Sequence, residues 1–548
     1  MMKKLKYLLL IPFFLGINSC ESTDLDGTDN VNALPPTSGD PSFILNYVQT
    51  EFASFYYDMS QDCRPVVRMV NQFGSYAGVA DPQDTQDQWT TAYTSILKNT
   101  KTLREVHATT PIPYHLGIAK ILEAYTMVTM VDFYGDVPYS ETLFGSANLL
   151  PRVDSGVSIY DKMIVSLDEA ITLLNTTGVL NTPTTDLYYG GDNSKWIKLA
   201  NSLKLKRYNN LRLTRDVSTQ VNAIVASGKI FTSNADDFNF KYSTTATGSD
   251  SRHPDYIAEY DGSPSFYLSN SYMKLLFADK TVIDPRRRFY FYRQTSAAPS
   301  GTNLPCSGNT NIPICYLGSG TWGGGYWGRD HADNTGIPAD GVRRAVVGLY
   351  PAGGRYDNNN YTQAAPDPLK PQLEANNAKG AGILNILDYS FVQFMLAELA
   401  LTESGVSGTP LTYLNNGVNA NITKVMTFRP DLQLGNIPTA ANVTSYKNEV
   451  TSKYNAAATP TDKLNVIEKE FFIAAWGNGM EAYNMYRRTG LPAHNPANIA
   501  IQSPVTAAGT FVRSYFYPTN AVNNNVNITQ HSLSTKVFWD NNPDNFVD

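Results

Sequence analysis

The spacing of apolar residues predicts helices in two blocks of the chain. Apolar residues recur every three or four positions, the period of one helix face, in five segments of the first half. These segments are about 41–58, 85–107, 112–134, 158–175 and 193–214. A second block shows the same period over about 386–402, 410–428 and 462–487. Consecutive helices of this length favour a mostly α fold of stacked, tetratricopeptide-like pairs, although no 34-residue repeat is visible in the sequence.

The helix expected over 193–214 shows how the pattern is interpreted. It follows "GDNS", so Asn193 or Ser194 is placed to cap its first turn. Trp196 shares one apolar stripe with Leu199 and Leu203. We therefore expect Trp196 in the core of the protein and not at a binding surface.

Between the two blocks, about 230–385 is rich in Gly, Pro, Asn and Ser and carries only short apolar pieces. Long irregular segments inside compact proteins are usually functional or disordered, and this one is too aromatic for disorder. Its most unusual stretch is "GSGTWGGGYWGRDH" (318–331), which sets large rings among glycines that favour neither helix nor strand. We expect an exposed binding loop. The alternative is that these rings fill a gap against the helices.

The N-terminus "MMKKLKYLLLIPFFLGINSC" has a basic start and a short apolar run that ends before Cys20. This order predicts a lipoprotein signal peptide over 1–19 and acylation of the Cys20 thiol, with a soluble secreted protein as the alternative. The acidic, proline-bearing residues 20–40 are expected to be a flexible tether. Residues 41–548 then form one domain. Its helical blocks are expected at about 41–229 and 386–490, around the insert of about 230–385.

Charge and cysteines narrow the chemistry. The net charge is −6 and no basic run follows the signal segment, so nucleic acid is not expected as a partner. Cys306 and Cys315 flank a turn-rich connection and are expected to form a disulfide, because the export route is oxidising. Cys63 is expected to be a buried thiol. Cysteine and histidine spacings match no zinc site, and we expect neither a metal nor a cofactor.

Four stretches, in order along the chain, carry a resemblance to a known family. They are "MVDFYGDVPYSE" (130–141), "WIKLANSLKLKRYNNLRL" (196–213), "EKEFFIAAWGNGMEAYNMYRRTGLP" (468–492) and the ending "STKVFWDNN". Together with the lipoprotein start, they resemble the SusD/RagB family of surface nutrient-binding lipoproteins. Each stretch also has a structural interpretation. Gly135 is expected to end a helix. Side chains near the end of a later helix are expected to hold neighbouring helices together rather than touch a nutrient: Glu481, Tyr483, Arg487 and Arg488.

The resemblance implies a fold and a division of labour. Family members have four tetratricopeptide-like helix pairs and a variable, loop-rich remainder. They are anchored by lipid at the extracellular face of the outer membrane and form a lid on a SusC-like TonB-dependent β-barrel transporter. They capture oligosaccharides, or in some cases peptides, and have no catalytic activity of their own. In the starch-binding members, aromatic rings in the variable region cradle the glycan.

These implications suggest which residues bind the ligand. Trp322, Tyr326 and Trp327 would cover the apolar faces of sugar rings, with Arg329 and Asp330 bonding the hydroxyls. The segment 64–89 can also line the site in this family. Its proposed contributors are Arg64, Asn71 and Tyr76, whereas Trp89 is expected on the core face of the helix that follows.

Three other functions remain open at this point. The same transport role could serve a peptide or another non-glycan ligand. A secreted glycan-degrading enzyme would need two carboxylates that face each other. With 49 acidic residues in the chain, the sequence neither supports nor excludes such a pair. No nucleophile-elbow or zinc-protease motif is present. A pure adhesion or assembly scaffold would use the helical pairs to engage proteins alone.

Overall fold

The computed structural model describes residues 39–261, 266–294, 325–333, 344–359, 377–492, 509–544 and 546. Trp322, Cys20, Cys306 and Cys315 lie outside these residues, so the expectations for them stay predictions. Pro41–Asp548 groups into one compact unit. Among the described residues, no helix is long and apolar enough to cross a membrane.

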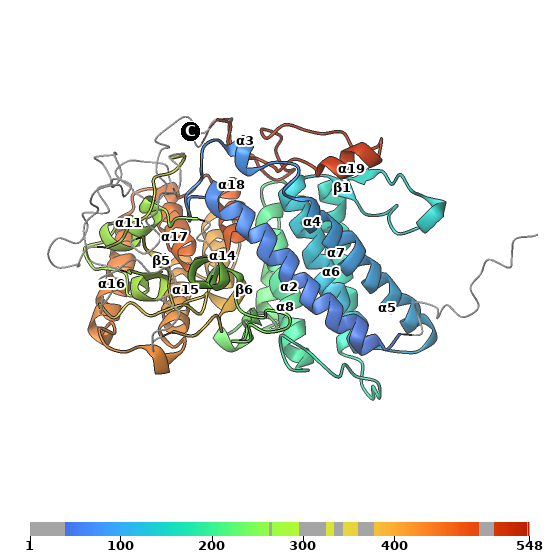
Figure 1. Cartoon of the computed structure of the whole chain (residues 1–548), viewed down its shortest axis with the longest axis horizontal. Helices are drawn as coiled ribbons and strands as arrows, with labels where there is room; N and C mark the ends of the chain where they lie inside the picture. Colours follow the sequence, from blue (N-terminus) through green and yellow to red (C-terminus); the bar gives the residue numbers. More distant parts are fainter. Residues whose placement is uncertain are drawn as a thin grey trace, which may run out of the picture. The chain divides into compact units, whose positions relative to one another are not determined.

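The first helical block begins with the long helix α2 (Pro41–Val66), which runs beside the following helices (Figure 1). It continues with α4 (Gln86–Thr90), the π-helical turn η3 (Thr91–Leu97), α5 (Lys98–Thr109) and α6 (Pro113–Tyr134). The helices α7 (Gly156–Leu174), α8 (Asn193–Leu211) and α9 (Ser218–Ala226) complete it. α6 packs against α7, α7 against α8, and α2 against both α5 and α6.

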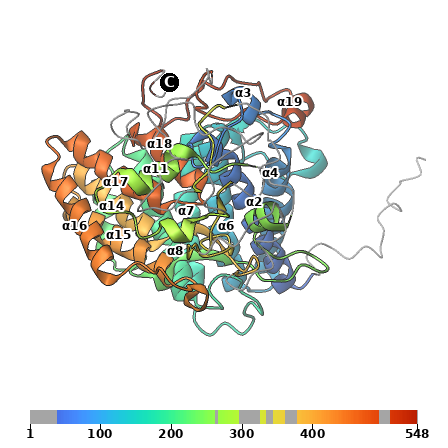
Figure 2. The same cartoon turned by 60° about the vertical axis from the view of Figure 1, so that its left-hand side comes forward.

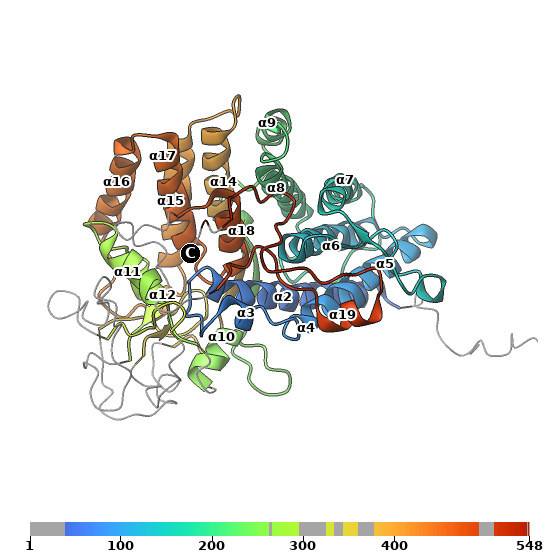
Figure 3. The same cartoon turned by 90° about the horizontal axis from the view of Figure 1, so that it is seen from above.

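The second block contains α14 (Tyr389–Thr402), α15 (Pro410–Met426), α16 (Ala440–Ala456), α17 (Pro460–Ala474) and α18 (Gly479–Thr489). α14 pairs with α15 and α16 with α17, and these four helices lie side by side in Figures 2 and 3. α18 returns to pack on α2, which joins the two blocks. The prediction of a mostly helical, paired architecture is confirmed.

Local sequence explains where the helices start and stop. The side chain of Asp192 accepts a hydrogen bond from the Ser194 backbone N–H, so Asp192 caps α8, one residue before the predicted Asn193 and two before the predicted Ser194. α6 ends at Gly135, whose φ of +91° lies in the region that favours glycine, as the motif predicted.

The predicted helices differ from the structure at three places: one predicted helix is two, and two helices were not predicted. The helix expected over 462–487 is two helices, because the chain turns at Gly477 (φ +86°) between α17 and α18. α16 was missed. Only Tyr446, Val450 and Tyr454 of that helix are buried, which gives a stripe too narrow for a clear apolar period. The short helix α9 was missed as well.

The irregular region between the blocks contains short elements rather than a layer of its own. The strand β3 (Phe238–Lys241) pairs antiparallel with β6 (Ile383–Leu387), with Phe238 opposite Leu387. The helices α10 (Pro254–Tyr256), α11 (Asn270–Ala278) and α12 (Arg287–Tyr290) lie between these strands in the sequence. The two-residue strands β4 (Phe291–Tyr292) and β5 (Val346–Val347) pair with each other.

Charged residues of the signature motifs hold the helices together. Buried Glu398 on α14 accepts hydrogen bonds from the Arg488 guanidinium at 2.6 and 2.7 Å and from Arg212 at 2.6 Å. Although burial opposes ionisation, these two cations lower the pKa of Glu398 to about 2. Lys206 forms an ion pair with Glu481. The prediction that these motif residues organise the fold is confirmed.

The aromatic and thiol predictions can also be checked. Trp196 is fully buried, and its indole N–H donates to Asp186 at 2.8 Å, which confirms its place in the core. Trp89 is half-buried; its ring packs at a tilted angle against Tyr93 and edge-to-face against Tyr134 and Tyr517. Cys63 is a free, fully buried thiol, as predicted.

Candidate functional site

Three segments far apart in the sequence meet beside the end of α2. Val70 forms an antiparallel bridge with Leu268, and the backbone N–H of Asn71 donates to the Tyr267 carbonyl at 2.8 Å. On the other side, Ser269 forms a parallel bridge with Arg329. The segment 266–270 therefore lies between the two segments that the sequence analysis singled out. Nothing in the sequence marked it for this position.

Gly328 shows how closely these segments approach. A Cβ atom at this position would lie 2.1 Å from the carbonyl oxygen of Leu268. Only glycine therefore fits beside this backbone. The glycines of this stretch predict a binding loop, but Gly328 instead permits the close contact between chain segments.

A pocket of about 280 Å³ opens at this wall, at the end of α2. Two of the predicted residues, Arg64 and Asn71, line it together with Gln72, Phe73 and Phe266. Phe73 is half-buried, and its ring meets the ring of buried Tyr267 at a centroid distance of 6.2 Å. The pocket thus combines aromatic surface with amide groups.

Arg64 is fixed from behind by an ion pair. Its guanidinium donates two hydrogen bonds to the Asp255 carboxylate, at 2.7 and 2.9 Å, and Tyr57 donates a third at 2.8 Å. Burial raises the pKa of Asp255, but the Arg64 charge outweighs it, and the pKa falls to about 2. The same guanidinium lies 5.3 Å from the ring centre of Phe266. Arg64 therefore positions the pocket wall through Phe266.

The side chain of Asn71 presents buried polar atoms to the pocket. Asn71 is 3% exposed, and among the residues that the structure describes neither its side-chain nitrogen nor its side-chain oxygen has a hydrogen-bond partner. The Oε1 atom of neighbouring Gln72 is likewise unpartnered, while its nitrogen donates to the Gly74 carbonyl at 2.9 Å. A buried amide without a partner costs about 1–3 kcal/mol. A polar ligand in the pocket would recover that cost.

Tyr76 does not line this pocket. It is fully buried and its hydroxyl oxygen lies 3.1 Å from both Arg68 Nη2 and His331 Nε2. Its ring also packs against the His331 ring at 5.5 Å. Tyr76 thus connects the segment 64–76 to the segment 325–333, the two regions that were predicted to contribute to one site.

The aromatic loop differs from its prediction. Tyr326 is fully buried, donates its hydroxyl to Asp357 at 3.0 Å, and carries the Arg293 guanidinium 4.3 Å from its ring centre. Trp327 is 4% exposed. The expectation that these two rings face solvent is wrong, because they pack against the folded insert. Their contact with a ligand stays a prediction.

The two polar residues of the loop have structural partners. Arg329 pairs with Asp333 at 3.0 Å, and its guanidinium lies 5.3 Å from the ring centre of Tyr267. Asp330 accepts a hydrogen bond from the Asn270 amide at 2.7 Å. Both residues are buried. They support the wall behind the pocket, and neither lines it.

Sequence reasoning missed the aromatic residues that do line the pocket. Phe73 lies inside the segment 64–89, where "NQFGSY" gave a weak signal, an aromatic ring beside a glycine. Phe266 gave none. In the part of the chain that the structure describes, no group of three His, Cys, Asp or Glu residues could hold a metal ion.

The fold and pocket together define a helical binding protein of stacked pairs with an irregular insert. Two family models match the chain: "Starch-binding associating with outer membrane" over residues 36–306, and "Susd and RagB outer membrane lipoprotein" over residues 373–540. The chain belongs to the SusD/RagB family of outer-membrane proteins. Neither description names a catalytic activity.

Solved structures share this fold over most of their length. A SusD homologue from Bacteroides fragilis aligns with a TM-score of 0.67 at 16% identity, covering 92% of this chain and 99% of its own. A protein described as chitin-binding aligns with a TM-score of 0.64 at 21% identity, covering 92% and 100%. A chitin-binding SusD homologue from Flavobacterium johnsoniae gives 0.63 at 18% identity, with the same coverage. No curated protein sequence matches this chain significantly.

Proposed function

We propose that this protein captures a neutral oligosaccharide at the pocket formed by Asn71, Phe73 and Phe266 and passes it to a TonB-dependent outer-membrane transporter. The observation that carries the proposal is the buried side-chain amide of Asn71, which lines an aromatic pocket and has no hydrogen-bond partner in the described part of the chain. An amide offers a donor and an acceptor side by side, which suits neighbouring sugar hydroxyls. Aromatic rings cover the apolar faces of the sugar.

Other observations support the transport role. The family descriptions associate its members with the outer membrane, and Cys20 follows a lipoprotein-type signal segment. Two similar structures are described as chitin-binding, so a chitin oligomer is the first ligand to test. We expect acylated Cys20 to anchor the protein on the extracellular face, beside a SusC-like barrel. We also expect Trp322, in the same insert, to contribute to the site.

The binding test uses the full-length lipoprotein in detergent with chitohexaose and maltoheptaose, measured by calorimetry. We expect Asn71→Ala and Phe73→Ala each to weaken binding of the preferred sugar at least about tenfold. Phe144→Ala is the matched control, because Phe144 is 57% exposed and does not line the pocket. Unchanged affinity in both pocket variants would contradict the site.

The alternatives have their own readouts. A sugar left intact after long incubation is expected, whereas new reducing ends would indicate a hydrolase. Binding of oligopeptides but of neither sugar would favour the peptide alternative. Tagged protein from solubilised outer membranes should bring down a large β-barrel near one to one. Purification without a barrel would contradict the transporter partnership, and other captured proteins would favour a scaffold.

A further inference from the structure

Four carboxylates meet between α2 and α4, and none of them forms an ion pair within the described part of the chain. Asp58 and Asp62 lie one turn apart on α2, and both are half-buried. Asp84 lies just before α4 and Asp87 lies on it, and both are exposed. Repulsion acts on Asp62 from Asp58 and Asp84, and on Asp58 from Asp87. Neither the sequence analysis nor the proposed function gives this acidic cluster a role.

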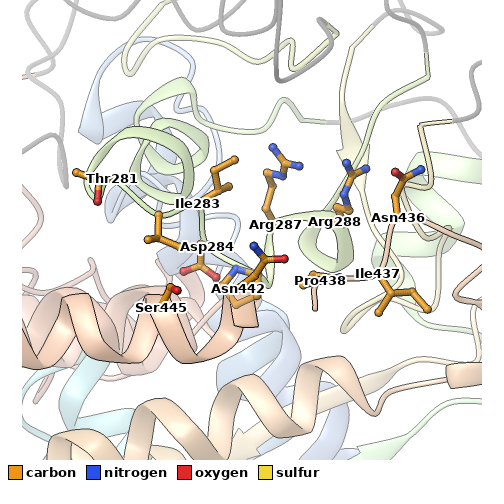
Figure 4. A pocket seen from close by; sticks show the side chains of 12 residues that line it. Thr281, Ile283, Asp284, Arg287, Arg288, Asn436, Ile437, Pro438, Asn442 and Ser445 are labelled. Atoms are coloured by element: carbon orange, nitrogen blue, oxygen red, sulfur yellow. The ribbon is translucent and has the colours of Figure 1, made fainter. Parts of the chain in front are cut away.

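A carboxylate at another cavity shows the usual arrangement. Asp284 lines a cavity of about 530 Å³ that faces the start of α16 (Figure 4). Its carboxylate accepts hydrogen bonds from the Arg286 guanidinium at 2.6 and 2.8 Å. Although burial opposes ionisation, this cation lowers the pKa of Asp284. The acidic cluster has no such bound cation among the described residues.

Burial and repulsion act in the same direction on the acidic cluster. Burial raises the pKa of Asp62 well above its ordinary value, and the charges of Asp58 and Asp84 add to the effect. Burial also raises the pKa of Asp58 to about 6, with a further contribution from Asp87. Arg64 opposes the shift at Asp62, but its guanidinium is already bound by the carboxylate behind the pocket. The acidic cluster therefore keeps protons at a pH at which an isolated carboxyl group has lost them.

Apart from Arg64, the other titratable groups that interact with Asp58 and Asp62 are thiol and phenol groups. Burial raises the pKa of each of them, so they are uncharged at neutral pH: Cys63, Tyr134, Tyr242 and Tyr515. Changes of charge here between pH 5 and pH 8 therefore come from the carboxyl groups of the acidic cluster.

The side-chain amide of Gln88 is bonded at only one of its two ends. Gln88 is 5% exposed, and its Nε2 donates to Asp62 Oδ2 at 2.9 Å. Its Oε1 is buried and has no hydrogen-bond partner among the described residues. A protonated Asp62 can donate its O–H to this oxygen, because a carboxylic acid and a primary amide match each other at two points. An ionised Asp62 can only accept, which leaves Gln88 Oε1 without a donor.

Both sides of this contact carry walls of the Asn71 pocket. Gln61 lies next to Asp62 on α2 and lines the pocket. Gly78 and Val79 line it from the segment that leads to α4. The contact between α2 and α4 therefore joins the two parts of the chain that form these walls.

We propose that Asp62 and Gln88 form a proton-dependent latch between α2 and α4, which holds the walls of the Asn71 pocket together at acidic pH and loosens as the pH rises. In the protonated latch, the Asp62 O–H donates to Gln88 Oε1, while Gln88 Nε2 donates to the other carboxyl oxygen. Loss of the proton removes the first hydrogen bond and adds a charge that Asp58 and Asp84 repel. The effect on ligand binding rests on the proposed function, whereas the latch rests on the contact between Asp62 and Gln88.

The latch makes stability fall as the pH rises. A carboxyl group with a raised folded-state pKa stabilises the fold fully below its unfolded value of about 4, and this contribution is lost as the pH rises through the folded value. The folded value is about 6 for Asp58 and is raised for Asp62 as well. We therefore expect the latch to be formed at pH 5 and weakened at pH 8.

The first experiment measures urea unfolding of the full-length lipoprotein in detergent at pH 5 and pH 8. Asp62→Asn keeps an acceptor for Gln88 Nε2, supplies a donor for Gln88 Oε1 and carries no charge. The difference between its unfolding midpoint and that of the wild type should grow in its favour from pH 5 to pH 8. Asp81→Asn is the matched control. It removes an exposed charge from the same segment and keeps the oxygen that accepts from the Gln83 backbone N–H, so its difference from the wild type should be equal at both pH values.

Gln88→Leu separates the latch from repulsion alone. In this background, the gain from Asp62→Asn at pH 8 should be smaller, because the amide that pairs with it is gone. An equal gain with and without Gln88 would mean that only repulsion acts, and the latch would be wrong. The latch would also be wrong if the difference between Asp62→Asn and the wild type did not change with pH.

The second experiment measures the affinity for chitohexaose and maltoheptaose by calorimetry at the same two pH values. We expect the wild type to bind its preferred sugar about tenfold more weakly at pH 8, a typical size for coupling between two sites. Asp62→Asn should bind equally at both. If wild-type affinity is the same at both pH values, the latch does not regulate the pocket. If the stability results hold but neither sugar binds at either pH, the proposed function at Asn71 fails together with its regulation, and the latch stands.

Discussion

The helical core and the Asn71 pocket use buried polar side chains in opposite ways. In the core, Glu398 accepts hydrogen bonds from Arg488, Arg212 and Asn209. Its negative charge is therefore neutralised by side chains of the protein itself. In the pocket, the side-chain amide of Asn71 is also buried but has no hydrogen-bond partner among the described residues. Buried polar groups that satisfy one another maintain a fold, whereas those left unsatisfied beside a pocket are available to a ligand. The contrast holds for these particular side chains and depends on the pocket beside Asn71, because the buried Arg207 guanidinium in the core also has no hydrogen-bond partner among the described residues.

The largest effect on stability is expected from breaking the core network. Glu398→Ala leaves the Arg488 and Arg212 guanidinium groups buried without their carboxylate, and we expect a loss of about 3–5 kcal/mol of unfolding free energy. Urea unfolding followed by circular dichroism measures it. Glu105→Ala, at an exposed position of α5 away from this network, is the control. A loss below about 1 kcal/mol for Glu398→Ala would contradict the structural role of the network.

The ion pair behind the pocket predicts acid sensitivity. Asp255 has a pKa of about 2 in the folded protein, below the value of about 4 expected when unfolded, so its contribution is present above pH 4. As the pH falls from about 4 to 2, about 2–3 kcal/mol of stability is lost. Asp255→Asn should therefore be less stable at pH 7, and the difference from the wild type should narrow on acidification. Parallel urea unfolding curves at pH 7 and pH 3 test this. A constant difference would contradict the assignment.

Tyr326 tests whether the buried ring of the insert serves the fold or a ligand. Tyr326→Phe removes the hydroxyl hydrogen bond to Asp357, and we expect a loss of about 1–2 kcal/mol of stability with unchanged chitohexaose affinity. Thermal unfolding and calorimetry give the two values. If affinity falls tenfold while stability is unchanged, Tyr326 is a ligand-binding residue, as the sequence analysis predicted.

The smallest effect on stability is expected at the pocket itself. Asn71→Ala removes a side-chain amide that makes no hydrogen bond to the described residues, so the unfolding free energy should change by less than about 1 kcal/mol. Asn484→Ala is the matched control. That buried amide donates to Asp132 and accepts from Arg487, both at 2.8 Å, and its removal should cost about 1–3 kcal/mol. Equal losses in the two variants would remove the contrast between core and pocket.

The candidate site was only partly predictable. Arg64 and Asn71 were found because the segment joining two helices was recognised as a site-lining region, and both line the pocket. Tyr326 and Trp327 were chosen because glycine-rich sequence suggested an exposed loop, but packing against Phe277, Arg287 and Arg293 buries Tyr326. Phe266 could not be found, since its position depends on a bridge between residues nearly two hundred positions apart.

The sequence by itself determined most of the helices, their stops at residues such as Gly135, and the burial of Trp196 and Cys63. These features depend on residues that are close in the sequence, and the spacing of such residues is visible as a periodic pattern. Only the tertiary structure decided that the segment 266–270 lies between 69–71 and 329, that Gly328 meets the Leu268 carbonyl, and that the Asn71 side chain has no hydrogen-bond partner among the described residues. Hydrogen bonds between distant segments leave no periodic trace in the sequence, because each partner is a backbone group that every residue carries.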